Sequence, residues 1–193
     1  MKVTPETLPD LDSLREERDR ERYRKKYRRV FRNTVFSLIT VAAIAILVAT
    51  LVLPVLQIYG TSMTPTLTEG DIVVSVKTKT YQQGDIVSFY YNNKILVKRV
   101  IATAGQWVDM DENGVVYVNG KPIDEPYLTE TAFGECDLIL PYQVPDGKIF
   151  VMGDHRATSV DSRSKTIGCV SEEQLVGKII FRVWPLTDFE KIT

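Results

Sequence analysis

Residues 35–58, VFSLITVAAIAILVATLVLPVLQI, form an apolar stretch without a single Asp, Glu, Lys or Arg. As an α-helix it would span roughly 36 Å at about 1.5 Å per residue, enough for the ~30 Å hydrocarbon core of a membrane. It is also longer than the apolar region of a cleaved secretory signal, about 7–15 residues. A buried core helix is the alternative, but a domain of this size has little with which to cover it. The sequence therefore predicts an uncleaved transmembrane signal-anchor helix over 34–58, which Pro54 can kink or end.

The residues before this stretch are densely charged, although the formal net charge of the chain is only −1. In residues 12–32 acidic side chains come early and basic ones late, which suits the dipole of a helix. The last bases follow one another without an intervening acid: Arg22, Arg24, Lys25, Lys26, Arg28, Arg29 and Arg32. Because cytoplasmic flanks of membrane helices carry the excess of Lys and Arg, residues 1–33 are expected to be a charged cytoplasmic arm. The chain beyond 58 then lies on the outer face of the plasma membrane.

The composition also limits the partners and cofactors. We expect the arm to form a solvated helix that touches anionic lipid, with a partner-binding arm as the alternative. The nearly neutral chain gives no argument for nucleic acid. Cys136 and Cys169 have no His or second Cys at metal-ligand spacing, so no metal or other cofactor is expected. A disulfide between them is permitted outside the cell, but sequence separation does not show that they meet.

Beyond Gly60 the sequence predicts short strands, because runs rich in Val, Ile, Tyr and Phe are separated by turn residues. The runs are residues 71–78, 85–91, 94–103, 114–123, 147–154 and 176–185. Asn119-Gly120 predicts a type I′ hairpin turn. The expected fold class is therefore mostly β: a single N-terminal transmembrane helix followed by an antiparallel β extracytoplasmic domain over 59–193. A small inserted subdomain is expected around 107–146.

Three segments could form a site, and the first is GTSMTPT, which contains Ser62. A nucleophilic serine needs an exposed position with free backbone N–H groups nearby for the oxyanion. An irregular stretch bounded by Gly60 and Pro65 can provide both. The alternative is an ordinary turn serine.

The second segment is ILVKRVIATAG, which contains Lys98. Alternate residues of a strand face opposite sides, so Lys98 and Arg99 point in opposite directions and one of them is expected to face an apolar surface. A desolvated ammonium loses its proton more easily, and a neutral amine is a general base. The alternative is an edge-strand lysine that guards against aggregation.

The third segment is GDHRATSVDSR, residues 153–163. It concentrates Asp154, His155, Arg156, Asp161 and Arg163 directly after an apolar strand. The repeated acid-x-Arg pattern predicts structured ion pairs within the segment. A solvated surface loop of charges is the alternative.

A single N-terminal span followed in order by GTSMTPTL, VKRVIATAG and GDHRATSVDSR resembles the bacterial type I signal peptidases. The resemblance extends from the anchor to about residue 184, and the short stretch between the second and third segments is similar to that of the Gram-positive branch. It implies a membrane-anchored serine endopeptidase that removes N-terminal signal peptides from exported preproteins and prefers small residues before the cut. It further implies a mostly antiparallel β fold, in which signal peptides bind as an added strand.

The resemblance implies a role for each matching residue. Ser62 would be the nucleophile and unprotonated Lys98 the general base. The backbone N–H of Ser62 would contribute to the oxyanion hole, and Gly60 could contribute only through its backbone, because the family usually has a serine there. Met63 and residues 95–97 are candidates for the pocket.

Further residues match supporting positions of the family. Ser159 matches the residue that orients the lysine amine. Asp161 and Arg163 match an ion pair that supports the site, and Asp154 and Arg156 match structural charges.

The sequence departs from the family pattern at His155, where Asn is usual, and near Ala157 and Thr158. As the only histidine, His155 allows a Ser62–His155–Asp triad as an alternative mechanism. The implied partners are signal peptides and the lipid bilayer, the chain being a monomer. A catalytically silent anchored β module that binds secretion partners is the alternative function.

Overall fold

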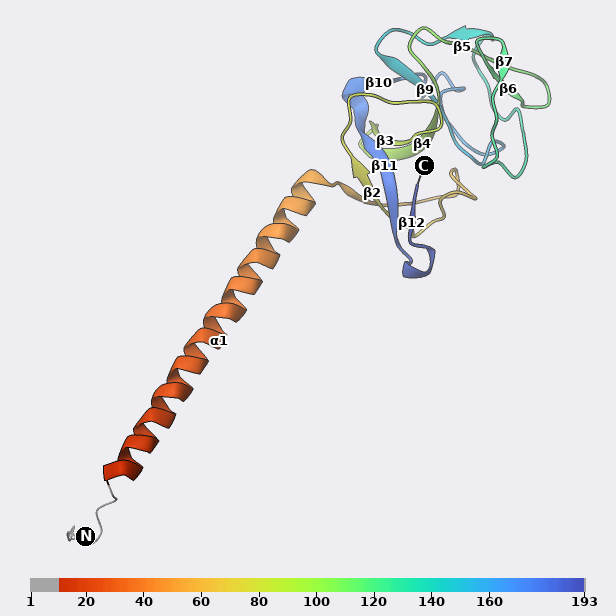
Figure 1. The fold of residues 1–193 in the computed structure, drawn as a ribbon. Helices are drawn as coiled ribbons and strands as arrows, with labels where there is room; N and C mark the ends of the chain where they lie inside the picture. The colour runs from red at the N-terminus through yellow and green to blue at the C-terminus, as the bar shows by residue number, and fades with distance from the viewer. Residues whose placement is uncertain (1–10, 193) are drawn as a thin grey trace. The chain divides into compact units, whose positions relative to one another are not determined.

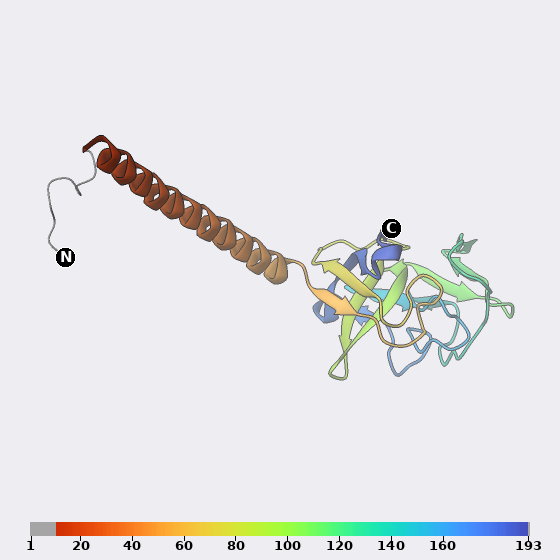
Figure 2. The same cartoon turned by 90° about the horizontal axis from the view of Figure 1, so that it is seen from below.

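The computed structural model describes residues 11–192, so the first ten residues of the predicted arm lie outside the described part. It contains one long helix, α1 (Leu11–Val52), and a domain of antiparallel strands. Figures 1 and 2 show α1 as one uninterrupted helix. The predicted fold class, mostly β with one long apolar helix at the N-terminal end, is confirmed.

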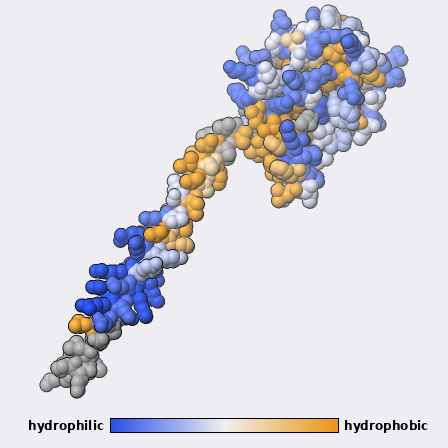
Figure 3. All heavy atoms as spheres, in the orientation of Figure 1, coloured by the Kyte–Doolittle hydropathy of each residue, from blue (hydrophilic) through white to orange (hydrophobic). Residues whose placement is uncertain are grey.

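The character of α1 changes along its length, from charged side chains to apolar ones (Figure 3). The described apolar side chains of its second half are exposed, among them Leu38, Ile44 and Ile46. Within residues 11–192, Leu14–Val48 contains the one helical stretch long and apolar enough to cross a membrane. An N-terminal helix of this kind fits a membrane anchor.

The structure corrects the predicted end of this helix. The prediction placed its end at 58, but α1 ends at Val52, and β1 (Val55–Gln57) pairs antiparallel with β2 (Ile72–Val76). Proline lacks the N–H that a helix needs and clashes with the preceding turn, so the helix stops before Pro54. The Pro54 carbonyl instead accepts the backbone N–H of Ser75 at 2.9 Å.

Most of the strands form one large sheet. Its order is β1-β2-β11-β3-β4-β9-β10, and β12 also pairs with β11. A smaller sheet has the order β7-β6-β5-β8. Besides β1 and β2, the strands are β3 (Ile86–Tyr91), β4 (Lys94–Thr103), β5 (Trp107–Met110), β6 (Val116–Val118), β7 (Lys121–Pro122), β8 (Tyr142–Gln143), β9 (Lys148–Met152), β10 (Val170–Ser171), β11 (Leu175–Trp184) and β12 (Glu190–Lys191). The 3-10 turns η2 (Glu172–Gln174) and η3 (Leu186–Asp188) flank β11.

The smaller sheet occupies residues 107–143 and packs on the larger one through a shared core. Val108 and Val116 of the small sheet belong to one buried cluster with Ile101 of β4 and Phe150 of β9. The β6–β7 hairpin turns at Asn119-Gly120, where both residues have positive φ (52° and 75°) as a type I′ turn requires. The predicted hairpin is thus confirmed.

A second buried cluster lies under the segment that follows β1. It contains Ile58, Met63 and Leu67 together with side chains of β2, β3 and β11. The chain from Ile58 to Leu67 is irregular, but its apolar side chains fix it to the large sheet. This anchoring holds the predicted nucleophile segment in place.

Candidate active site

The turn that carries Ser62 is held by apolar side chains and by local hydrogen bonds. Met63 and Leu67 are buried, and the N–H of Leu67 donates to the Met63 carbonyl at 2.9 Å. The N–H of Thr64 donates to the Thr61 carbonyl at 3.1 Å. Gly60 enters the turn with a φ of +81°, a conformation that residues with a side chain rarely adopt. Ser62 is half-buried and directly precedes the buried Met63, which holds it at the surface of the sheet.

Strand β4 brings Lys98 to this turn. The Nζ of Lys98 lies 2.5 Å from the Oγ of Ser62, and only 3% of the residue is exposed. On the neighbouring strand β3, Val87 stands opposite Lys98 and is fully buried. No carboxylate among residues 11–192 forms an ion pair with this amine.

Burial lowers the pKa of Lys98 from 10.5 to about 8. The cause is desolvation, because a charged ammonium loses the water that stabilises it. The carboxylates of Asp161 and Asp154 act in the opposite direction, and the guanidinium of Arg163 lowers the pKa further. The neutral form of the amine is therefore far more populated near physiological pH than in an ordinary lysine. Its lone pair can then accept the hydroxyl proton of Ser62.

Arg99, the next residue of β4, is buried as deeply as Lys98 but is paired. Its Nε donates to Oδ1 of Asp154 at 2.9 Å and its Nη2 to Oδ2 at 2.7 Å. Thr66, from the nucleophile segment, also donates to Oδ2 of Asp154 at 2.5 Å. We expected one of the two cations to face an apolar surface, whereas both are buried. The difference between them is the counterion, because a guanidinium keeps its charge and requires one.

Backbone donors for an oxyanion are present beside Ser62. Among the described residues, no acceptor takes the backbone N–H of Ser62 or of Gly60. The Ser62 carbonyl, by contrast, accepts the N–H of His155 at 3.1 Å. Free N–H groups next to a nucleophile can stabilise the negative oxygen of a tetrahedral intermediate.

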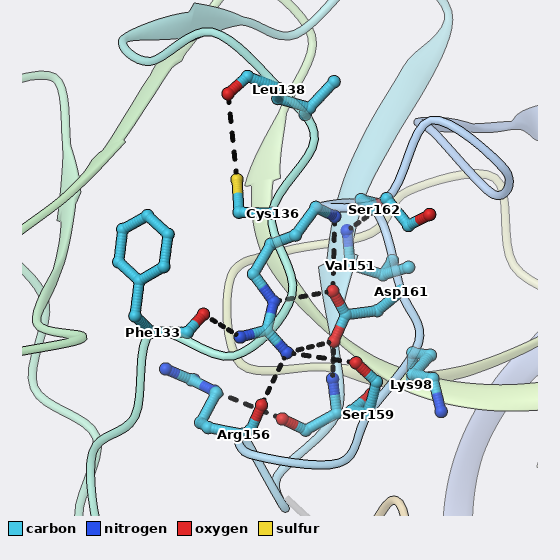
Figure 4. Close-up of polar contacts among 12 residues, drawn as sticks. Lys98, Phe133, Cys136, Leu138, Val151, Arg156, Ser159, Asp161 and Ser162 are labelled. Carbon is cyan, nitrogen blue, oxygen red and sulfur yellow. Dashed lines mark hydrogen bonds and ion pairs between the residues drawn. The ribbon is translucent and has the colours of Figure 1, made fainter. Parts of the chain in front are cut away.

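The loop of residues 153–163, which we call the catalytic loop, is organised by one buried ion pair. The Arg163 Nε donates to Oδ1 of Asp161 at 2.9 Å, and Nη2 donates to Oδ2 at 2.9 Å. Oδ2 of Asp161 also accepts the Gly153 N–H at 3.0 Å, which ties the two ends of the loop together. Figure 4 shows the Asp161 carboxylate at the centre of these contacts, with Phe133 and Arg156 around it.

The predicted ion pairs within this loop are only partly present. Asp161 pairs with Arg163, but Asp154 pairs with Arg99 of β4. Arg156 forms a bidentate ion pair with Glu125, outside the loop. The expectation that both acid-x-Arg repeats pair locally is therefore wrong for the first repeat.

Ser159 is buried close to the nucleophile turn. Its hydroxyl makes no hydrogen bond to any described residue, so the contact with the Lys98 amine that the resemblance implies stays a prediction. The approach is close because residue 153 is glycine. A Cβ at this position would lie 2.2 Å from the Ser159 Oγ and 2.5 Å from the Ser62 carbonyl oxygen.

The ring of His155 takes no part in the Ser62–Lys98 contact. Its Nδ1 lies 2.5 Å from the Oγ1 of Thr158, three residues along the same loop. The contribution of His155 to the site is its backbone N–H on the Ser62 carbonyl. A Ser62–His155 pair, the alternative base considered from the sequence, is not formed among the described contacts.

A small cavity of about 90 Å³ adjoins Ser62 and Lys98. Much of its lining is apolar, from residues 56–60 on one side and 95–97 on the other, with Met63 between them. The exposed ends of β1 and β4 thus frame the cavity. It suits small apolar side chains.

Sequence reasoning missed two residues that support the catalytic loop, Glu125 and Tyr127. Both come from the irregular segment after β7, where EPY gives no distinctive pattern. Their importance follows only from tertiary contacts with Arg156 and Arg99.

Among residues 11–192, no group of His, Cys, Asp and Glu side chains is arranged to hold a metal ion, and Cys136 and Cys169 are free thiols.

Comparisons with known proteins agree on one family. A family model described as "Signal peptidase, peptidase S26" matches residues 31–184. Signal peptidase IB of Staphylococcus aureus (strain COL) is 40% identical over 153 residues, 69% of this chain and 78% of its own. Signal peptidase I of Bacillus licheniformis is 34% identical over 177 residues, 82% of this chain and 94% of its own. The crystal structure of a signal peptidase I from Enterococcus faecalis V583 is also similar, at 27% identity and a TM-score of 0.45, covering 53% of this chain and 98% of that one.

We expect Gly153→Ala to lower the free energy of unfolding by about 1–3 kcal/mol, because the added methyl overlaps Ser159 and the Ser62 backbone. Urea unfolding followed by the fluorescence of Trp107 and Trp184 would measure this. The double variant Gly153→Ala/Ser159→Gly should recover part of the loss. Wild-type stability of Gly153→Ala would contradict the close packing described for residue 153.

Proposed function

The chain belongs to the signal peptidase family, peptidase S26, and on this basis we propose that it is a membrane-anchored serine endopeptidase with a Ser62–Lys98 dyad. Its substrates are exported preproteins, from which it removes the N-terminal signal peptide. The observation that carries the proposal is the 2.5 Å approach of a buried, unpaired Lys98 amine to the Ser62 hydroxyl.

In the first half of the reaction Ser62 attacks the scissile carbonyl carbon. The neutral Lys98 amine takes the hydroxyl proton as the Oγ–carbon bond forms. The carbonyl oxygen becomes an oxyanion, which the free N–H groups of Ser62 and Gly60 stabilise. When the intermediate collapses, the Lys98 ammonium returns its proton to the nitrogen of the departing mature chain. This leaves the signal peptide esterified to Ser62.

In the second half of the reaction a water molecule takes the place of the departed amino group of the mature chain. Lys98, neutral again, takes a proton from this water molecule while the water oxygen attacks the ester carbon. Collapse of the second intermediate breaks the bond to Ser62, whose Oγ recovers the proton from Lys98. The products are the free signal peptide and the mature protein, and the enzyme returns to its initial state.

Substrate binding rests on the cavity beside the dyad. The proposed signal peptide lies extended along the exposed end of β4, where main-chain hydrogen bonds can add it as a further strand. A cavity of about 90 Å³ admits small side chains before the cut and excludes large ones. This size limit supports a preference for Ala-like residues.

We propose that α1 anchors the enzyme as a monomer, with the N-terminal arm in the cytoplasm and the β domain on the outer face. The support is the basic cluster before the apolar half of α1, on the side that membranes keep cytoplasmic. Only the residues between Val52 and Ser62 separate the helix from the nucleophile in the chain. A membrane-bound preprotein is thus the natural substrate.

The Lys98→Ala variant is expected to lose cleavage of a preprotein with an Ala-x-Ala site almost completely, by about 10³-fold or more, because the base is removed. Ser62→Ala should behave in the same way. Lys121→Ala, which removes an exposed lysine of β7 outside the cavity lining, serves as the control and should retain activity. Undiminished cleavage by folded Lys98→Ala would reject the dyad, and no cleavage by any form would favour a silent binding module.

The pH dependence of kcat/KM is expected to follow the titration of Lys98. The amine is protonated and inactive as a base below its pKa, so kcat/KM should rise with pH and level off above about 8. Initial rates of peptide cleavage from pH 6 to 10, within the range where the protein stays folded, would measure this. A profile that is flat over this range, or that falls through 8, would speak against a neutral lysine base.

The proposed orientation in the membrane is tested with epitope tags on intact protoplasts. A tag after Thr193 should bind antibody without lysis, because the β domain is outside. A tag before Met1 should become accessible only after the membrane is opened. The reverse pattern would invert the proposed topology.

A further inference from the structure

The segment between β7 and β8 contacts the catalytic loop without contributing to the dyad. The Phe133 carbonyl accepts the Arg163 Nη1 at 2.7 Å, and the Asp137 N–H donates to the Arg163 carbonyl at 3.0 Å. Gly134 lies so close that a Cβ there would come within 2.6 Å of the Arg163 guanidinium. The same segment also forms an ion pair with the catalytic loop, between Glu125 and Arg156.

The Glu125 carboxylate is buried, and both of its oxygens accept hydrogen bonds. Its carboxylate accepts both Nη atoms of Arg156, Nη1 at 2.9 Å on Oε2 and Nη2 on Oε1. Oε1 also accepts the hydroxyl of Tyr127 at 2.6 Å. The side chain of Glu125 is 7% exposed and that of Arg156 is 1% exposed. A bidentate pair of this kind fixes the orientation of the guanidinium as well as its position.

Arg156 transmits this fixed orientation to the backbone of the catalytic loop. Its Nε donates to the Gly153 carbonyl at 3.1 Å, and its own carbonyl accepts the Arg163 Nη2 at 2.9 Å. Between these two points lies His155, whose N–H holds the Ser62 carbonyl. The position of Ser62 therefore depends on the backbone that Arg156 fixes.

Tyr127 links Glu125 to the second buried arginine. The Arg99 guanidinium lies 3.8 Å from the centroid of the Tyr127 ring, an arrangement typical of a cation–π contact. Arg99 in turn holds Asp154, the loop residue between Gly153 and His155. Glu125 and Tyr127 thus support both arginines that hold the start of the catalytic loop.

We propose that Glu125 is a positioning residue for the Ser62–Lys98 dyad, acting through Arg156 and the backbone of residues 153–156. Its role is to keep this backbone against the Ser62 carbonyl and so to keep Ser62 aligned with Lys98 and the Lys98 amine shielded from water. The inference rests on the proposed function, because it assigns a role within the same reaction. The alternative is an ion pair that stabilises the fold and has no effect on the dyad.

The test compares Glu125→Gln with Asp124→Asn in the full-length protein in detergent. Asp124 is the exposed neighbour of Glu125, so the control removes the same charge one residue away. We expect kcat of Glu125→Gln on an Ala-x-Ala peptide to fall about 10- to 100-fold, the scale of a misplacement of roughly 1 Å. KM should change by less than about twofold, because the cavity is untouched. Asp124→Asn should match the wild type in both constants.

A second readout follows the titration of Lys98 itself and needs no substrate. In protein labelled with ¹³C at the lysine ε-carbon, the Lys98 resonance is assigned by its loss in Lys98→Ala. In Glu125→Gln a loosened loop admits water, so the resonance should titrate at higher pH than in wild type, towards 10.5. Loss of the Glu125 charge alone would act in the opposite direction, because a carboxylate favours the ammonium.

The outcomes separate the inference from the proposed function. If wild type cleaves and folded Glu125→Gln matches it in kcat, the inference is overturned while the function stands. If wild type does not cleave, the function fails, and the Lys98 titration alone decides: no change or a shift to lower pH overturns the inference.

If Glu125→Gln does not fold, Tyr127→Phe replaces it. This variant keeps the ring under Arg99, removes one hydrogen bond to Glu125, and should show smaller changes of the same sign in kcat and in the titration.

Discussion

Two adjacent cations of β4 are buried on opposite faces of the strand, and the domain neutralises only one of them. Arg99 has a bidentate carboxylate partner in Asp154, whereas Lys98 has the Ser62 hydroxyl. The change of the Lys98 pKa from 10.5 to about 8 corresponds to roughly 3 kcal/mol in favour of the neutral amine. The protein therefore buries a lysine whose charged form would be more stable in water. The contacts around Lys98 must be strong enough to keep that water out.

Much of the β domain can be understood as the structure that maintains this burial. The apolar cluster of Met63 and Leu67 fixes the nucleophile turn from below, and the Asp161–Arg163 pair closes the catalytic loop. The small sheet and the irregular segment after it add contacts from outside the loop. These elements are far apart in sequence, and each packs against its own neighbours. Their common effect is a half-buried serine and a buried amine at hydrogen-bonding distance.

The fold class could be predicted from sequence because it depends on local signals, whereas the pairing of Ser62 with Lys98, 36 residues away, followed only from the resemblance to a family. The apolar run, the turn residues and the ordered segments each carry information within a few residues. The partners of Arg99 and Arg156 could not be predicted in this way. An Asp two residues from an Arg suggests a local pair, yet Asp154 and Arg156 find their partners in β4 and after β7. The end of α1 was misplaced for a related reason, since Val55 and Leu56 continue the apolar run of the helix but pair with β2.

The short connection between α1 and β1 would have a kinetic consequence for the proposed membrane-anchored enzyme. Only Leu53 and Pro54 lie between the last helical residue and the first strand residue, and the Pro54 carbonyl is itself bonded to Ser75. If α1 anchors the chain as proposed, the length of this connection limits how far Ser62 and Lys98 can move from the bilayer surface. Encounters of the proposed enzyme with a membrane-bound preprotein would then take place in two dimensions, by lateral diffusion. Their frequency is set by the number of molecules per unit area of membrane, and an intrinsically weak affinity for the cleavage site is sufficient at the high local concentration that tethering creates.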